Sequence, residues 1–283
     1  MKHLLSLLLL AASLTATAGR VVTDSIESRV LGAGVKYNVY LPKGYDASGT
    51  TTYPIVYLLH GFTDTYTAWV EKGQMQMVAN ELIETGEARP MIIVMPNAGG
   101  PDVMETWNGY MNMPGWAYED FFFEEFVPTV EAKYRAGGSK GLRAVMGLSM
   151  GGGGSTMYCQ RHPDKFSSCY AMSAWLESDG GHQKVEGTDD KVYLVEQAMK
   201  QHSALRFIKE ADEATLAQLR SVKWFFDCGD DDFLFDLSVR IHQLYRERHV
   251  KDELRIRNGV HNWEYWHTAL RLALPFASRN FER

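Results

Sequence analysis

Two short runs, IVYLL at residues 55–59 and MIIVM at residues 91–95, are apolar at every position. A strand with one face in water alternates apolar and polar residues, whereas a strand covered on both faces does not. Both runs are therefore typical of a parallel sheet that lies between two layers of helices. No other feature of the chain restricts its fold as strongly.

Further strand-like runs alternate with helical patterns along the chain. Strands are predicted over residues 35–41, 142–146, 168–172, 223–228 and 254–257. Apolar side chains at helical spacing occupy residues 117–134, 237–249 and 263–276. This alternation predicts a mainly parallel sheet with right-handed crossovers. No helix separates the first two runs, at 35–41 and 55–59, which indicates an antiparallel edge.

The stretch from Ser173 to Val222 breaks the alternation. It contains the turn-rich segment DGGHQKVEGTDD, followed by helical patterns near residues 193–201 and 214–219. We expect an insertion over one end of the sheet, which serves as a lid or as a pocket wall.

The N-terminus and the charge indicate where the protein works. Lys2 precedes a nearly continuous apolar run over residues 4–12, and residues 16–18 (ATA) fit a small-residue cleavage pattern. Residues 1–18 are therefore predicted to be a signal peptide, and residues 19–283 a single domain. The residue directly after the cleavage position is not a cysteine, so we expect a secreted or periplasmic protein without a lipid anchor. The sequence predicts no membrane span, and a net charge of −6 without a Lys/Arg block predicts no nucleic-acid partner.

Residues 147–155 read GLSMGGGGS. The last five letters resemble a flexible linker, but apolar residues of core type flank them directly. A strand-like run precedes GLSMG and a helical segment follows it, which is the nucleophile elbow of the α/β-hydrolases. The sharp turn raises Ser149 above the sheet, and the N–H of Met150 points to where an oxyanion forms. We expect the glycines at 152–154 to let the helix pack closely on the sheet.

A nucleophilic serine needs a base and an acid, which in this fold follow it in the order Asp or Glu, then His. His261 follows a strand through a turn and precedes a helix, so it is the predicted base. Asp230, Asp231 and Asp232 all follow the run KWFFDC, and their spacing alone does not choose among them. The two that are not used are expected to cap the helix near Asp236 or to face water. A calcium site is an alternative, but the wider ligand pattern is missing.

The loop after IVYLL reads HGFTD and completes the predicted site. The N–H of Phe62 is the second candidate oxyanion donor, and His60 is expected to fix the loop by a hydrogen bond. Trp107, Trp175 and Trp263 fall near the active face, where aromatic rings can bind an aromatic acyl group or a sugar. Ordinary core packing is the alternative for each tryptophan.

The segments YPIVYLLHGFTDTYTAW, MPNAGG, GLSMGGGGS, CGDDDFL and GVHNWEYW together resemble the esterase-D-like α/β-hydrolases. The resemblance extends over about residues 26–276. It implies an α/β-hydrolase fold, with a mainly parallel central sheet, helices on both faces and an insertion between strands 6 and 7. The family pattern C-G-x-x-D-x-L begins at Cys228 and implies that Asp232 is the acid, and H-G followed by an apolar residue implies Phe62. The family often has a bulky residue where this chain has Gly153.

The resemblance also implies the activity of a serine carboxylesterase, which uses Ser149, His261 and Asp232 and needs no metal or other cofactor. The group includes secreted feruloyl and acetylxylan esterases and intracellular S-formylglutathione hydrolases. Export favours feruloyl or acetyl esters on plant cell-wall polysaccharide such as xylan. One alternative is an esterase or acyltransferase for another exported ester, such as a siderophore, a short-chain lipid or a glucan ester. The other is a secreted binding protein that has the fold but no activity.

Overall fold

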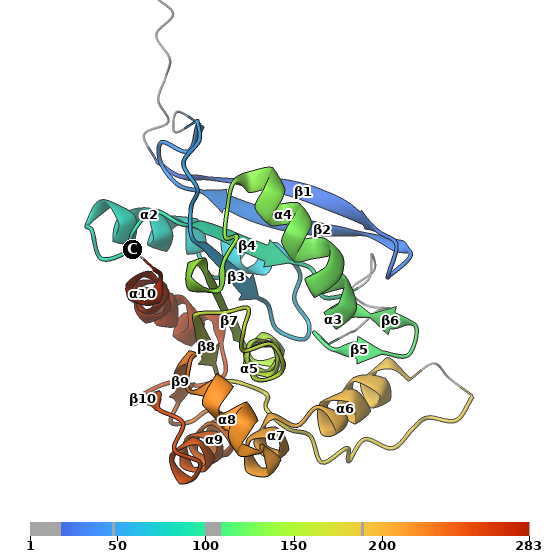
Figure 1. Cartoon of the computed structure of the whole chain (residues 1–283). Coiled ribbons are helices and arrows are strands. Elements are labelled where there is room, and N and C mark those ends of the chain that lie inside the picture. The colour runs from blue at the N-terminus through green and yellow to red at the C-terminus, as the bar shows by residue number, and fades with distance from the viewer. Residues whose placement is uncertain (1–17, 47–48, 100–108, 188–189, 283) are drawn as a thin grey trace, which may run out of the picture.

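One sheet of eight strands runs through the computed structural model, which describes residues 18–46, 49–99, 109–187 and 190–282 (Figure 1). The strand order from edge to edge is β1-β2-β4-β3-β7-β8-β9-β10. These strands are β1 (Arg20–Ser28), β2 (Ala33–Leu41), β3 (Ile55–Leu59), β4 (Ile92–Pro96), β7 (Arg143–Leu148), β8 (Ser168–Met172), β9 (Lys223–Gly229) and β10 (Asp252–Arg257). A separate ladder of two strands consists of β5 (Asn112–Met113) and β6 (Trp116–Ala117). The predicted signal peptide lies outside the described residues except for Ala18.

The sheet is mainly parallel, as predicted. β3 pairs in parallel with β4 and β7, and parallel pairing continues through β8, β9 and β10. The antiparallel edge consists of β1 and β2, and β2 also runs antiparallel to β4. The predicted antiparallel edge from the runs at 35–41 and 55–59 is wrong. β3 is buried at every residue and takes an interior place between β4 and β7, where both of its edges are paired.

Helices cover both faces of the sheet, which confirms the predicted fold class (Figure 1). On one face lie α1 (Ala68–Glu71), α2 (Met75–Glu84) and α10 (Trp263–Asn280). On the other lie α3 (Tyr118–Asp120), the π-helical η2 (Phe121–Phe126), α4 (Val127–Tyr134), α5 (Met150–Arg161), α7 (Ala204–Glu210), α8 (Glu213–Leu219) and α9 (Phe235–Glu247). A short 3₁₀ turn, η3 (Lys140–Leu142), precedes β7.

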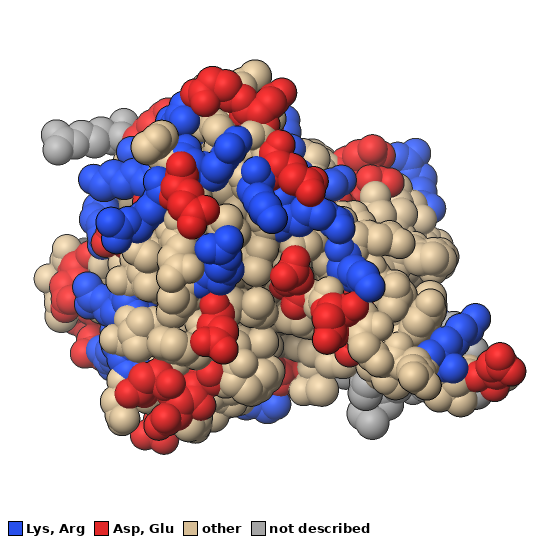
Figure 2. Space-filling model, turned by 90° about the horizontal axis from the view of Figure 1, so that it is seen from below, with Lys and Arg blue, Asp and Glu red and all other residues tan. Residues whose placement is uncertain are grey.

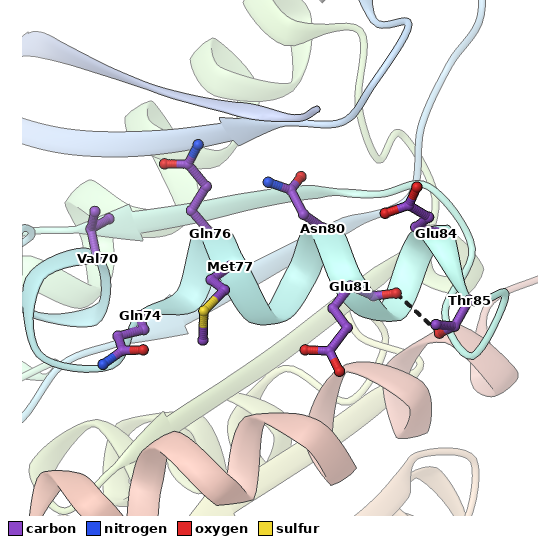
Figure 3. Close-up of a pocket in the computed structure, with 8 residues that line it drawn as sticks. All are labelled: Val70, Gln74, Gln76, Met77, Asn80, Glu81, Glu84 and Thr85. Carbon is purple, nitrogen blue, oxygen red and sulfur yellow. Dashed lines mark hydrogen bonds between the residues drawn. The ribbon is translucent and has the colours of Figure 1, made fainter. Parts of the chain in front are cut away.

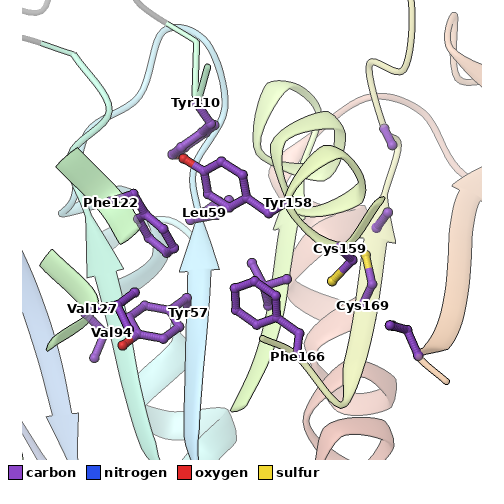
Figure 4. Close-up of a cluster of buried hydrophobic side chains, with 14 of the residues drawn as sticks. Tyr57, Leu59, Val94, Tyr110, Phe122, Val127, Tyr158, Cys159, Phe166 and Cys169 are labelled. Atoms are coloured by element: carbon purple, nitrogen blue, oxygen red, sulfur yellow. The ribbon is translucent and has the colours of Figure 1, made fainter. Parts of the chain in front are cut away.

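Strand β3 shows why a continuous apolar run suits this sheet. Its side chains alternate between the faces, so Tyr57 and Leu59 lie in one buried cluster while Val56 and Leu58 lie in the other. Figure 4 shows the first cluster, in which the rings of Tyr57 and Phe122 lie 5.2 Å apart and edge to face. Because both faces are covered, a polar side chain at any position of the strand would be buried away from water.

The insertion lies between β8 and β9, the sixth and seventh strands of the sheet in chain order. Its helices α7 and α8 bury Ile208, Leu216 and Leu219 in the main core, so they complete the helical layer. The remaining helix, α6 (Lys191–Gln201), lies beside the β5–β6 ladder (Figure 1) and packs Met199 into a smaller apolar cluster with Met113. The insertion is therefore partly core, and only α6 fits the predicted pocket wall.

Charged side chains of both signs are interspersed on the face shown in Figure 2. Neither sign forms a continuous field over that face, although the whole chain carries a formal net charge of −6. Among the described residues, every helix is too short or too polar to cross a membrane.

Candidate active site

Ser149 occupies a strained turn between β7 and α5. Its backbone has a φ of 51° and a ψ of −118°, which a residue other than glycine adopts only when its surroundings enforce it. The Ser149 N–H donates to the carbonyl of Met172 at 2.9 Å, and its carbonyl accepts from Gly153 at 3.0 Å and from Trp175 at 2.9 Å. The end of β8 and the chain after it therefore hold the turn in place.

The glycine run is part of helix α5 and is fully buried, so the linker interpretation is wrong. A Cβ at Gly151 would lie 2.5 Å from the carbonyl oxygen of Leu59, which is too close for any side chain. A Cβ at Gly153 would lie 2.0 Å from the carbonyl oxygen of Trp175. Gly151 thus lets the helix approach β3, and Gly152, whose Cβ would lie 2.9 Å from the carbonyl oxygen of Met172, lets it approach β8, as expected of the glycines at 152–154. Gly153 instead admits the first residues of the insertion, which explains why this chain cannot carry a bulky residue there.

The structure brings Ser149, His261 and Asp232 together in a chain of hydrogen bonds. Ser149 Oγ lies 3.0 Å from His261 Nε2, and His261 Nδ1 lies 2.9 and 3.0 Å from the two carboxylate oxygens of Asp232. A carboxylate only accepts, so Nδ1 carries the proton and Nε2 is left to accept the serine hydroxyl proton. This is the tautomer that a general base needs.

The surroundings of Asp232 keep it ionised. Burial opposes its charge, but hydrogen bonds from His261, the Leu234 N–H and the Ser173 hydroxyl hold its pKa below the ordinary value. Ser173 is buried, has a φ of 44° and accepts the indole N–H of Trp266 at 3.0 Å. Ser173 thus supports the acid from behind. We did not predict it, because nothing in its sequence context sets it apart from an ordinary serine after a strand.

The other two aspartates of the GDDD segment do not cap helix α9. The helix begins after Leu234, and no side chain caps it. Asp230 instead accepts the N–H of Gly259 at 2.9 Å, while Asp231 is exposed and its N–H donates to the Gly259 carbonyl at 3.1 Å. Capping is therefore ruled out, and the alternative expectation, that these two aspartates face water, is confirmed. These bonds join the loop that carries Asp232 to the loop that carries His261.

A second buried carboxylate, Asp227, lies below these two loops. It is fully buried in β9 and accepts hydrogen bonds from Tyr170 at 2.6 Å and from Tyr265, and it pairs with Arg257 at 3.1 Å. Arg257 ends β10 just before the loop of His261, and Tyr265 lies on α10 just after it. The cluster therefore fixes both ends of the histidine loop. A charged residue within the apolar run KWFFDC is the signal that could have revealed it.

His60 fixes the loop that carries Phe62, as predicted. The Ala98 N–H donates to Nε2 at 3.0 Å, so Nδ1 is protonated and donates to the Gly61 carbonyl at 2.7 Å. Burial lowers the pKa of His60 to about 4, so the ring is neutral. The other candidate oxyanion donor, the N–H of Met150, opens helix α5, where N–H groups have no partner within the helix.

Of the three tryptophans predicted to bind substrate, Trp107 lies outside the described residues. The other two, Trp175 and Trp263, have different surroundings. Trp175 is half-buried, and its ring meets that of Phe62 edge to face at 6.1 Å. Trp263 packs edge to face against Trp69 at 5.2 Å and also contacts Trp266. Trp175 therefore lies next to the candidate oxyanion loop, whereas Trp263 mainly extends the core under α10.

Half-buried Trp116 joins the same aromatic group. Its indole N–H donates to the Ala98 carbonyl at 3.1 Å. With Phe62 and Trp175 it packs against the apolar cluster that contains Met111, Met113, Met157 and Met199.

A cavity of about 700 Å³ lies along α2, away from these residues (Figure 3). Its lining consists of Val70, Gln74, Gln76, Met77, Asn80, Glu81, Glu84 and Thr85. This lining includes neither a nucleophile paired with a base nor Ser149, His261 or Asp232. The size of the cavity therefore does not make it the candidate active site.

The arrangement around Ser149 can perform acyl transfer, because a hydroxyl, a base and an acid lie in hydrogen-bond contact beside two candidate oxyanion donors. Within the described part of the chain, no three His, Cys, Asp or Glu side chains gather closely enough to hold a metal ion. The three cysteines, Cys159, Cys169 and Cys228, are buried and form no disulfide.

Several known proteins are similar to this chain in sequence or in fold. The family model called Esterase matches residues 28–277. A solved ferulic acid esterase is 46% identical, with a TM-score of 0.89 over 93% of this chain and 99% of that one. An endo-1,4-beta-xylanase/feruloyl esterase of Xylanibacter ruminicola is 30% identical over 132 residues, which cover 46% of this chain. Endo-1,4-beta-xylanase Y of Acetivibrio thermocellus is 31% identical over 150 residues, or 48% of this chain. The matches span only 18% and 12% of these two proteins.

Proposed function

The chain belongs to the Esterase family, and on that premise we propose that it is a secreted serine carboxylesterase that removes feruloyl or related hydroxycinnamoyl groups from plant cell-wall polysaccharide. The observation that carries this proposal is the 46% identity to a ferulic acid esterase over nearly the whole chain. Acetyl groups on xylan are the second acyl class that we include. The proposed enzyme is one catalytic domain over residues 19–283, which follows a signal peptide over residues 1–18.

In the proposed mechanism, His261 takes the proton of Ser149 as its oxygen attacks the ester carbonyl. Asp232 stabilises the imidazolium that forms, and the N–H groups of Phe62 and Met150 bind the oxyanion. His261 then donates its proton to the leaving alcohol. Water hydrolyses the acyl-enzyme in a second step with the same groups.

The aromatic residues beside the oxyanion loop support an aromatic acyl group. Phe62, Trp116 and Trp175 pack together against the apolar cluster that contains Met113 and Met199. These partly exposed rings suit a planar phenolic group, whereas an acetyl group would leave most of this surface unused.

The test compares the wild type with Ser149→Ala on methyl ferulate, on feruloylated arabinoxylan and on acetylated xylan. Loss of the nucleophile is expected to lower kcat by at least about 10⁴-fold, because only binding and the oxyanion donors remain. A fluorophosphonate probe should label the wild type and the control Ser155→Ala, which removes a buried hydroxyl from the same helix, but not Ser149→Ala. Full activity in Ser149→Ala contradicts the mechanism. Activity on short p-nitrophenyl esters alone contradicts the proposed substrate.

A further inference from the structure

A large aromatic ring beside the catalytic histidine is exposed to solvent. Phe233 follows Asp232 directly, and 76% of its surface is accessible. Its ring lies against the imidazole of His261, with the centroids 4.4 Å apart and the planes tilted by 48°. A single exposed apolar side chain is common on protein surfaces. This one differs because its ring is in contact with the imidazole of the proposed base.

The reaction geometry defines which part of the substrate reaches this ring. His261 must protonate the leaving oxygen through Nε2, so the alcohol half of the ester lies on the histidine side of Ser149. Phe62 and Trp175, whose ring centroids lie 6.1 Å apart, belong instead to the candidate oxyanion loop and to the chain after β8. A ring that contacts His261 and faces solvent is therefore next to the alcohol.

A polar cavity of about 430 Å³ lies next to the loops that carry Phe233 and His261. Asp231, two residues before Phe233, belongs to its lining, as do Asn258, Asn262 and Glu264. Val260, which is 45% exposed, lines it as well, and Val260 and Asn262 flank His261 in the sequence. An exposed apolar ring with amide and carboxylate groups on the neighbouring loop suits a ligand that has both hydroxyl groups and apolar C–H faces, which is the chemistry of a sugar ring.

We propose that Phe233 is a specificity-determining residue that covers the apolar face of the sugar whose hydroxyl is esterified. Asn258, Asn262 and Glu264 hydrogen-bond to hydroxyl groups of that sugar or of its neighbour in the polysaccharide. This subsite makes the enzyme prefer a sugar ester to the ester of a small alcohol with the same acyl group. The inference rests on the proposed function, because it assumes that Ser149 forms an acyl-enzyme and that His261 protonates the alcohol.

The experiment compares kcat/KM for two substrates with one acyl group, methyl ferulate and a feruloylated arabinoxylan oligosaccharide. In Phe233→Ala, the ratio of kcat/KM for the sugar ester to that for the methyl ester should fall about tenfold relative to the wild type, which is the loss expected for one aromatic contact. Phe233→Trp keeps an aromatic face and should retain the wild-type ratio. Met77→Ala, which removes a 49%-exposed apolar side chain from α2, is the matched control and should leave the ratio unchanged.

Phe233 contacts His261, so the ring could act only by holding the imidazole. In that case Phe233→Ala lowers kcat/KM for both substrates equally and slows fluorophosphonate labelling of Ser149, and the proposal is overturned. An unchanged ratio with normal labelling overturns it as well. Failure of the proposed function gives a different result, because the wild type would then hydrolyse neither ferulate ester.

Discussion

The two sides of Ser149 are held by different physical means. On the helix side, backbone touches backbone: Gly151 faces the Leu59 carbonyl and Gly153 faces the Trp175 carbonyl, with no room for a Cβ. On the histidine side, hydrogen bonds and charges do this work, because Asp232 binds His261 and Asp230 binds the next loop. The helix side is rigid because its volume is full. The histidine side is held by polar contacts and stays partly open to water, as suits the proposed role of His261 in moving a proton to the alcohol.

This difference predicts that the two sides fail in different ways. Changes on the histidine side should reduce the rate while the fold survives, since a polar contact can be lost without displacing atoms. Changes on the helix side should reduce stability first, since an added atom must displace the backbone.

The largest expected effect is on the histidine side. Asp232→Asn should lower kcat by about 10⁴-fold on a small aryl ester, because an amide can donate to Nδ1 and stabilise the tautomer that cannot accept the serine proton. The unfolding free energy, measured in urea, should change much less than the rate. Asp231→Asn is the matched control, since its carboxylate is exposed in the same loop, and it should stay within about threefold of the wild type. Equal losses in the two variants would argue against Asp232 as the acid.

The next effect breaks the helix side. Gly→Ala within a helix usually stabilises a protein by about 1 kcal/mol, but Gly153→Ala should lower the unfolding free energy by about 2 kcal/mol. The new Cβ must push away the backbone of Trp175, not a flexible side chain. Gly181→Ala is the control, because its Cβ meets only the carboxylate of Asp179. Urea unfolding that ranks Gly153→Ala as stable as this control would contradict the packing argument.

The smallest effect concerns pH and the loop of Phe62. His60 has a pKa of about 4 in the fold, below the ordinary value of 6.5, so the unfolded chain binds a proton first as the pH falls. This proton uptake should reduce wild-type stability by about 1 kcal/mol between pH 7 and pH 5.5. His60→Gln lacks the titration, so the stability difference between wild type and variant should narrow by that amount.

Urea unfolding at the two pH values measures this change. Met77→Ala, which removes a 49%-exposed side chain that does not titrate, is the control, and its difference from wild type should stay nearly constant. A difference for His60→Gln that widens toward low pH would contradict a neutral, buried imidazole.

The sequence predicted those parts of the molecule that depend on local pattern. Strands β3 and β8 begin and end where their apolar runs do, because burial on both faces leaves a clear signal. β1 (Arg20–Ser28) was missed, since an edge strand in which only Ser28 is buried shows no apolar run. Helix α7 (Ala204–Glu210) was missed as well, because its short pattern is set by contacts with the core.

The candidate site divides in the same way. Ser149 and His261 follow from the order of strands, turns and helices, whereas the choice of Asp232 needed the resemblance to a family. Ser173 and Asp227 could not be placed, because their partners come together only when β8, β9 and α10 pack.

The close approach of Gly153 to the Trp175 carbonyl makes the residue at position 153 depend on the path of the chain after β8. In a homologue with a larger residue at the position of Gly153, the chain after β8 must lie farther from helix α5. The type of residue at this position therefore indicates the path of the insertion in other members of the family. The insertion of such a homologue should fit into this chain. The insertion of this chain should fit into the homologue only if the larger residue there is also replaced by glycine.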